Sequence, residues 1–167
     1  MTISVRHAHA EDAEGIARLY SAGIAERGAT FETEPRTADD VLARMRSARP
    51  EHVTLVGVDD SGSVVSAAWL SPYSARPVYS GIAEFSVYVD TTVRGRGAGT
   101  VLLAGLLQAA RDAGLHKVTS RVFVENRASR SLCAALGFAE VGIHRRHARL
   151  DGRWRDVVLV ERLLADP

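Results

Sequence analysis

Seven residues near the middle of the chain have the composition of an anion-binding turn. Arg94-Gly95-Arg96-Gly97-Ala98-Gly99-Thr100 lies between an apolar run that ends at Val89 and a helix-like stretch that begins near Gly97. Glycines let the backbone approach a ligand closely, and the free N–H groups at a helix start bind anions with help from the helix dipole. Two arginines add direct charge pairing. This turn predicts a phosphate or pyrophosphate site, the alternative being an ordinary tight strand-to-helix turn.

Two common phosphate-binding motifs do not fit this turn. A nucleotide-hydrolysing P-loop needs Gly-Lys-Ser or Gly-Lys-Thr at the helix start, and Gly99-Thr100-Val101 has no lysine. A dinucleotide-binding domain places its glycine turn after the first strand, with an acidic residue about 20 residues further on. Here the turn follows several strands, and Glu125 comes roughly ten residues too late. ATP hydrolysis and dinucleotide binding are both disfavoured.

One carboxylate interrupts an otherwise apolar run over residues 82–89. Glu84, if it faces inward, is suited to take a proton from an ammonium group, directly or through water. On an alternating strand it would equally well face solvent, and periodicity does not decide between the two.

The elements that must position these residues follow from hydrophobic periodicity. Strands are expected at residues 3–7, 53–58, 64–70, 82–89, 117–124, 138–143 and 156–163, and helices at 11–25, from the N-cap Thr37 to near Pro50, at 97–113 and at 128–136. Strands gathered in the middle of the chain, with strand-helix-strand units later, predict an α/β fold. We expect a mixed, mainly antiparallel central sheet with helices on both faces.

Length and composition limit the function classes. The 167 residues fit one domain over 1–167, and 46% hydrophobic with 25% charged residues is typical of a globular protein. A net charge of +1 gives no global field for nucleic acid or an anionic membrane, so a small-molecule partner is favoured. No apolar run approaches the roughly 20 residues needed to span a bilayer, and the first residues lack the apolar core of a signal peptide, so a cytoplasmic location is expected. The single cysteine, Cys133, predicts neither an intramolecular disulfide nor a zinc site.

Two ordered motifs give the chain a family resemblance. Arg94, Gly97 and Gly99 fit a cofactor-loop pattern of Gln or Arg, two residues, Gly, one residue, then Gly or Ala. Asn126-Arg127-Ala128-Ser129 and Leu136-Gly137-Phe138 follow in the same order as later motifs of that family. The chain thus resembles the GNAT superfamily of acetyl-CoA-dependent N-acetyltransferases. The resemblance implies a GNAT fold of about seven strands, acetyl-CoA as cosubstrate and no metal.

Within that superfamily, the chain is similar to the phosphinothricin (methionine sulfoximine) N-acetyltransferases from Ile3 to about Leu163. The similar segments are two loops, at residues 30–35 and 72–79, and the strand at 84–89. The resemblance implies a homodimer that acetylates the α-amino group of a small amino acid or an antimetabolite, an activity linked to antibiotic resistance. The alternatives are acetylation of a protein N-terminus, a polyamine or an aminoglycoside, and a catalytically silent acyl-CoA-binding sensor.

The resemblance also implies roles for individual residues. Glu84 would be the general base, and Phe31 and Arg76 would contact the substrate. The cofactor would be bound by Val87, Tyr88, Val89, Arg94, Gly95, Arg96, Gly97, Ala98, Gly99, Thr100, Asn126 and Ser129. Asn126 and Ser129 are strong N-cap residues, so the competing interpretation is that they only cap a helix.

The chain departs from this group at two places. Ser74 stands where several relatives have a basic residue, and Cys133 stands where the group has histidine and many other members have a tyrosine as general acid. Buried packing is the favoured interpretation for Cys133. His144 and His147 are substitutes for the acid. Residues 144–155 hold five arginines, for which two roles compete. A nucleic-acid patch is disfavoured because the stretch has one tryptophan for base stacking. We expect instead a hairpin that brings some of the arginines to the mouth of the substrate site.

Overall fold

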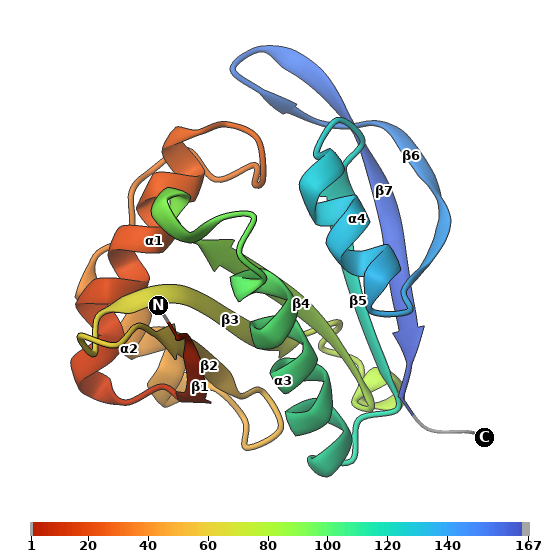
Figure 1. Ribbon diagram of the computed structural model, residues 1–167. Coiled ribbons are helices and arrows are strands. Elements are labelled where there is room, and N and C mark those ends of the chain that lie inside the picture. Colours follow the sequence, from red (N-terminus) through yellow and green to blue (C-terminus); the bar gives the residue numbers. More distant parts are fainter. Residues whose placement is uncertain (1, 165–167) are drawn as a thin grey trace.

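Seven strands form one sheet in the order β1-β2-β3-β4-β5-β7-β6 (Figure 1). The computed structural model describes residues 2–164, so the two ends of the predicted domain, Met1 and 165–167, lie outside the described residues. The strands are β1 (Ser4–His7), β2 (Thr54–Val58), β3 (Val64–Pro72), β4 (Ile82–Val89), β5 (Lys117–Phe123), β6 (Ala139–Leu150) and β7 (Arg153–Leu163). The helices are α1 (Ala13–Ala25), α2 (Ala38–Ser47), α3 (Ala98–Asp112) and α4 (Arg127–Ala135), with short 3-10 turns η1 (Ala10–Asp12), η2 (Pro77–Tyr79) and η3 (Thr91–Val93).

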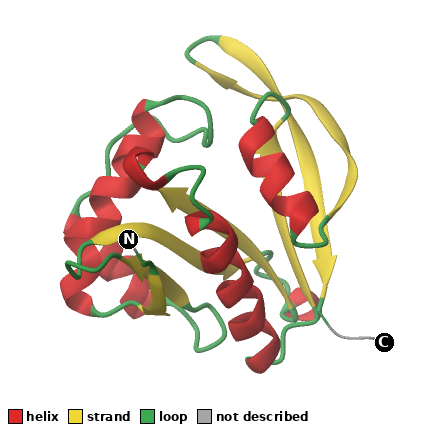
Figure 2. Ribbon diagram, viewed as in Figure 1, coloured by secondary structure: helices red, strands yellow, loops and turns green. Residues whose placement is uncertain are grey.

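The predicted fold class is confirmed. Every neighbouring pair of strands is antiparallel except β4 and β5, and helices cover both faces of the sheet (Figure 2). On one face, Leu102 and Leu106 of α3 pack with Val118 and Val160. On the other, Ile16 of α1 and Val41 of α2 pack against residues of β2 and β3. Among the helices of residues 2–164, none has the length and apolar composition needed to cross a bilayer.

Two boundaries show how local chemistry shapes the elements. Thr37 caps α2 as predicted, because its hydroxyl accepts from the Asp40 amide at 3.2 Å while the Asp40 carboxylate accepts from the Thr37 amide at 2.8 Å. The first helix, expected from Glu11, is a 3-10 turn until Ala13. The cause is Asp12, whose carboxylate accepts from the His9 amide at 2.7 Å and tightens the chain there.

The hairpin of β6 and β7 is longer than the predicted strands at 138–143 and 156–163. Its two strands pair as far as Leu150 and Arg153, and a turn with positive φ at Asp151 and Gly152 joins them. Nearly every residue of β6 is exposed, and its register shifts twice. Since such a strand has no alternation of buried and exposed residues, hydrophobic periodicity could not define its full length.

The parallel pairing of β4 and β5 is short, and this feature positions the site. Only Ile82, Ala83 and Glu84 of β4 pair with β5, opposite Lys117, Val118 and Thr119, and beyond them the two strands diverge (Figure 1). We call the region between residues 85–89 of β4 and 120–123 of β5 the β4–β5 split. On its other edge, β4 remains paired with β3 from Ala83 to Val89. The split therefore leaves one edge of β4 available to a ligand inside the sheet.

Candidate active site

The glycine turn lies at the mouth of the β4–β5 split. Gly95 and Gly97 have φ angles of +74° and +83°, a left-handed conformation that side chains disfavour, and α3 begins immediately afterwards at Ala98. A Cβ at Gly99 would lie 3.5 Å from Cγ2 of Val89, so the first turn of α3 is close to the end of β4. The predicted strand-turn-helix is confirmed, and it aims the unpaired N–H groups of the first helical turn at this mouth.

The two arginines of the turn have different environments. Arg94 donates to both carboxylate oxygens of Glu26, at 2.9 and 2.7 Å, and its Nε donates to the Val89 carbonyl at 3.0 Å. The Glu26 carboxylate raises the pKa of Arg94. Arg96 is exposed and forms no ion pair with any residue from 2 to 164. In contrast to the expectation that both arginines face phosphate, Arg94 fastens the turn to the end of α1, which leaves Arg96 for an anion.

The open edge of β4 presents alternate residues. The Ser120 hydroxyl donates to the Phe85 carbonyl at 3.1 Å, and Arg94 reaches the Val89 carbonyl, so the backbones of these two residues face the split. Because N–H and C=O groups alternate between the two edges of a strand, the backbone of Val87 faces the split as well.

Tyr88 is a correction within the predicted cofactor set, because the same alternation turns its backbone towards β3. Its ring packs on the face of the sheet that α1 covers, 4.9 Å from the ring centre of Tyr20 and 5.4 Å from that of Trp69. Burial raises the pKa of the Tyr88 phenol. Backbone groups alternate between the two edges of β4, and the pairing register decides which of them face the β4–β5 split. The sequence does not show this register.

Asn126 and Ser129 adopt the capping arrangement. The Asn126 side-chain oxygen accepts from the Ser129 amide at 3.1 Å at the start of α4, and its Nδ2 donates to the Gly28 carbonyl at 3.2 Å. Asn126 therefore ties the start of α4 to the loop that follows α1. These bonds leave one N–H of Nδ2 and one lone pair of Oδ1 for the cofactor contact that the resemblance implied.

Glu84 lies on the face of the sheet opposite α3 and forms an ion pair across the β4–β5 split. Nη2 of Arg121, on β5, donates to Oε1 of Glu84 at 2.6 Å, and the Glu84 side chain is 26% exposed. A carboxylate beside a guanidinium differs from the apolar environment that the sequence suggested. Sequence reasoning missed Arg121, although its signal was present: it is a lone charge in the otherwise uncharged stretch 118–124.

His144 and His147 lie 5.0 Å apart between ring centres on β6. Burial, followed by the charges of His144 and Arg121, lowers the pKa of His147. Arg121 therefore connects the histidine pair electrostatically with Glu84. The two histidines belong to the Glu84 side of the sheet and not to the glycine turn.

The two predicted substrate contacts are not brought together. Phe31 packs edge-on against Phe123, with ring centres 4.8 Å apart, at the end of β5. Arg76 lies over the Tyr79 ring at 5.6 Å, in the loop before β4. The first residue of β4 pairs with the first residue of β5, so this loop lies near the start of β5. Within one chain, Phe31 and Arg76 therefore lie towards opposite ends of β5.

Cys133 lies in the core, as the packing interpretation requires. Its residue is 2% exposed, and burial raises the pKa of its thiol to about 11. Among the described residues, no cluster of three or more histidine, cysteine or acidic side chains could hold a metal ion.

Comparisons with known proteins agree with this geometry. The acetyltransferase (GNAT) family model matches residues 16–138. The chain is 35% identical over 166 residues to the phosphinothricin N-acetyltransferase of Streptomyces coelicolor, covering 97% of this chain and 96% of that protein. It is 31% identical over 168 residues to the L-methionine sulfoximine/L-methionine sulfone acetyltransferase of Pseudomonas aeruginosa, covering 100% and 97%.

A solved structure gives the same result in three dimensions. The crystal structure of a GNAT superfamily phosphinothricin acetyltransferase from Sinorhizobium meliloti in complex with acetyl-CoA superposes with a TM-score of 0.91 at 27% identity, covering 98% of this chain and 89% of that one. Both the sequence match and the fold extend through the glycine turn, β4, β5 and α4. The chain therefore belongs to the acetyltransferase (GNAT) family.

Proposed function

We propose that this protein transfers the acetyl group of acetyl-CoA to the α-amino group of a small amino acid or an amino-acid-like antimetabolite such as phosphinothricin or methionine sulfoximine. One observation carries the proposal: the glycine turn, the open edge of β4 and the Glu84 side chain converge on a single split in the sheet. The activities named for the relatives support the substrate class.

The residues around the β4–β5 split fit acetyl-CoA. Arg96 and the amides at the start of α3 would bind the pyrophosphate, since they combine positive charge with unpaired N–H donors. The backbones of Val87 and Val89 would hydrogen-bond the pantetheine arm along the edge that β5 leaves open. When bound, acetyl-CoA supplies an acyl group activated as a thioester.

Proton handling is assigned to Glu84. An amine attacks a thioester only as the neutral base, so an ammonium substrate must first lose a proton. The Glu84 carboxylate would accept it, and Nη2 of Arg121 contacts the same carboxylate at 2.6 Å. The leaving thiolate of CoA must receive a proton in return. We assign this role to His144 or His147, which lie on the same side of the sheet as Glu84.

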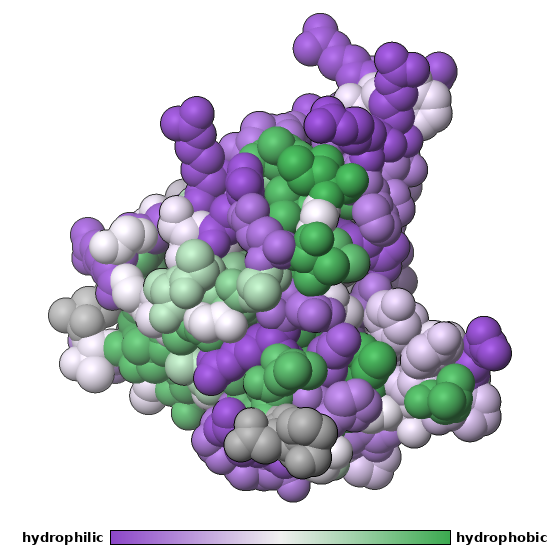
Figure 3. Space-filling model, turned by 90° about the vertical axis from the view of Figure 1, so that its right-hand side faces the viewer, coloured by the Kyte–Doolittle hydropathy of each residue, from purple (hydrophilic) through white to green (hydrophobic). Residues whose placement is uncertain are grey.

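The charge around the site favours anionic over cationic substrates. Residues 144–155 bring five arginines to the β6–β7 hairpin, whereas a polyamine or aminoglycoside site would need carboxylates. Hydrophilic side chains project at the top of Figure 3, where Figure 1 places the hairpin turn.

The β6 side of the molecule supports a homodimer. Val141 is 54% exposed on this edge strand, and Ile143, two residues further along it, is 46% exposed. Hydrophobic side chains gather among hydrophilic ones on this side of the molecule (Figure 3). Exposed apolar groups on an unpaired edge strand are typical of a surface that a second chain covers. Sedimentation equilibrium should give twice the 18.0 kDa chain mass, and a monomer would contradict the dimer.

The activity is tested by measuring CoA release with a panel of amines. The panel contains phosphinothricin, methionine sulfoximine, L-methionine sulfone, the common amino acids, spermidine, an aminoglycoside and a short peptide. Turnover confined to α-amino acids supports the proposal. Turnover confined to the polyamine, aminoglycoside or peptide would overturn the substrate class. Acetyl-CoA binding by calorimetry without turnover of any amine would identify a silent sensor.

A further inference from the structure

Arg121 pairs with Glu84 through one nitrogen only. Nη2 donates to Oε1 at 2.6 Å, and no other hydrogen bond from this guanidinium reaches a described residue. Three other arginine–carboxylate pairs of the chain each use two nitrogens: Arg6 with Asp12, Arg94 with Glu26, and Arg130 with Glu140. Two parallel N–H donors are frequent in such pairs, and Arg18, which gives one nitrogen to Asp90, uses another on the Val64 carbonyl. Arg121 therefore keeps donors available for a second carboxylate.

The pair is accessible from solvent. The side chain of Arg121 is 46% exposed and that of Glu84 is 26% exposed, on the side of the sheet away from α3. Arg121 also influences His147, which belongs to the basic hairpin. Among residues 2–164, Glu84 is the one carboxylate that Arg121 contacts. No second carboxylate of the described residues therefore competes with an incoming anion for this guanidinium.

We propose that Arg121 binds the α-carboxylate of the substrate and thereby releases Glu84 to accept the proton of the α-ammonium group. The proposal rests on the proposed function. An α-amino acid carries its ammonium and carboxylate groups on the same carbon atom, and Glu84 and Arg121 are an acceptor and a donor in direct contact. The zwitterion can thus replace one ion pair by two.

The exchange balances in atoms and charge. The Arg121 N–H group turns from Oε1 of Glu84 to a substrate carboxylate oxygen, and no covalent bond breaks. One N–H bond of the ammonium group then breaks as an O–H bond forms on Glu84, which leaves a neutral amine. Arg121 stays protonated throughout, because a guanidinium does not deprotonate in proteins.

The proposal separates the tasks of two arginines. Arg121 contacts the residue that would receive the amine proton, so it is placed for the carboxylate on the carbon that bears this amine. Arg76 lies in the loop before β4, against Tyr79, and is left for an acidic group elsewhere on the substrate. An amine without an α-carboxylate cannot displace Arg121, so it meets a Glu84 that is already paired.

The test compares two substrates that differ only in the carboxylate, L-methionine sulfone and 3-(methylsulfonyl)propylamine. We expect Arg121→Gln to raise KM for the amino acid by roughly 10- to 100-fold, the worth of one hydrogen bond to a charged group. For the amine, kcat/KM should stay constant or rise, because no pair has to be broken. Arg121→Lys keeps the charge and should give an intermediate KM for the amino acid.

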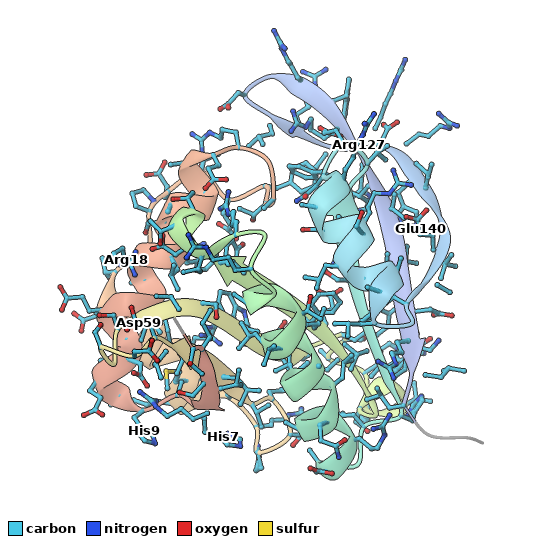
Figure 4. The ribbon with its side chains drawn as sticks, in the orientation of Figure 1. His7, His9, Arg18, Asp59, Arg127 and Glu140 are labelled. Atoms are coloured by element: carbon cyan, nitrogen blue, oxygen red, sulfur yellow. The ribbon has the colours of Figure 1, made fainter. Side chains whose placement is uncertain are left out.

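Controls separate this outcome from its alternatives. Arg130→Gln removes the surface pair with Glu140, labelled on β6 in Figure 4, and should leave both substrates unchanged. An equal loss of kcat/KM for both substrates in Arg121→Gln, or no loss for either, would overturn the proposal while the proposed function stands. A wild type that acetylates the amine but no α-amino acid would remove the proposed function, and the proposal with it. Acetyl-CoA affinity and thermal unfolding confirm that each variant is folded.

Discussion

The glycine turn at residues 94–100 and the Glu84–Arg121 pair lie on the same split but are built in opposite ways. The turn is made of consecutive residues, and its function depends on backbone N–H groups that a helix start always leaves unpaired. The pair joins side chains 37 residues apart, which meet only because β4 and β5 are neighbours in the sheet. A backbone site can be recognised in a short stretch of sequence, whereas a side-chain site depends on the topology.

The roles of Arg94 and Arg121 are the reverse of what their positions in the sequence suggest. The motif arginine Arg94 holds the turn in place through Glu26, while Arg121, outside any motif, is half-exposed and incompletely bonded. If this contrast is correct, substitutions in the pair should change the chemistry, and substitutions in the turn should change cofactor binding.

The sharpest separation is expected from Glu84→Gln. Loss of a general base lowers kcat by about 10²- to 10⁴-fold, while acetyl-CoA affinity should not change because the turn is untouched. Glu140→Gln, in the exposed pair with Arg130, is the matched control and should keep wild-type kcat. Stopped-flow turnover and calorimetry measure the two quantities. Wild-type turnover of the Gln variant from pH 6 to 9 would place the base elsewhere.

Asp90, which lies between β4 and the glycine turn, is tested through the free energy of unfolding. Asp90 accepts from the Thr92 amide at 3.0 Å and from Arg18 at 2.7 Å, and these bonds hold its pKa at about 2 instead of 3.8. Because the folded-state pKa is depressed, the stabilisation is complete above about pH 4 and is lost as pH falls towards 2.

Asp90→Asn should therefore lower the free energy of unfolding by about 1 to 2 kcal/mol at pH 7, and by much less near pH 2. Urea unfolding at several pH values measures the difference. Figure 4 shows Arg18 on α1, so an Arg18→Gln variant should reproduce part of the loss. A pH-independent difference between wild type and Asp90→Asn would show that the carboxylate charge is not the cause.

The turn itself is tested by two glycines with the same conformation. Gly97 has φ +83° and Gly62 has φ +82°, and a Cβ at either would meet no atom within 4 Å. Alanine at either position should cost about 1 kcal/mol of backbone strain. Only Gly97→Ala should weaken acetyl-CoA binding, by roughly tenfold, because it displaces the amide donors at the start of α3. Equal affinities of the two variants would remove the turn from the cofactor site.

The smallest effects are expected on the β6–β7 hairpin. Neutralising Arg145, Arg146 and Arg149 singly should raise KM for an anionic amino acid by about 2- to 5-fold in at least one variant, as exposed charges are worth little each. Acetyl-CoA affinity should not change. The effect should shrink at 0.5 M salt, where exposed charges are screened. If none of the three changes KM at low salt, the hairpin is a solvated surface.

Most of the fold could be predicted because its signals are local. The Thr37 cap, the glycine turn and the apolar faces of α1 and α3 depend on residues a few positions apart. The full length of β6 could not be predicted, since nearly all its residues are exposed and its register shifts twice. A strand without a buried apolar face shows no alternation of apolar and polar residues from which its length could be predicted.

The candidate site was predicted in part for the same reason. The position of the turn and the placement of Glu84 on a strand were predicted, but the partner of Glu84 was not. The orientation of the Tyr88 backbone depends on register parity, and the tie between Asn126 and Gly28 depends on a loop 98 residues away. Each of these missed features requires knowledge of which strands and loops are neighbours.

The short pairing of β4 with β5 has a consequence for how the molecule opens. Backbone pairing between β1–β4 and β5–β7 is limited to three residue pairs. Side-chain bonds such as Glu84–Arg121 and Ser120–Phe85, and the core under α3, add to this seam. Amide protons on either side of this seam should exchange with solvent as two cooperative units. A molecule bound in the split would contact both units at once, so its binding energy would hold them together. Hydrogen-exchange protection gained on binding should then extend well beyond the contacted amides, to the far strands of both units.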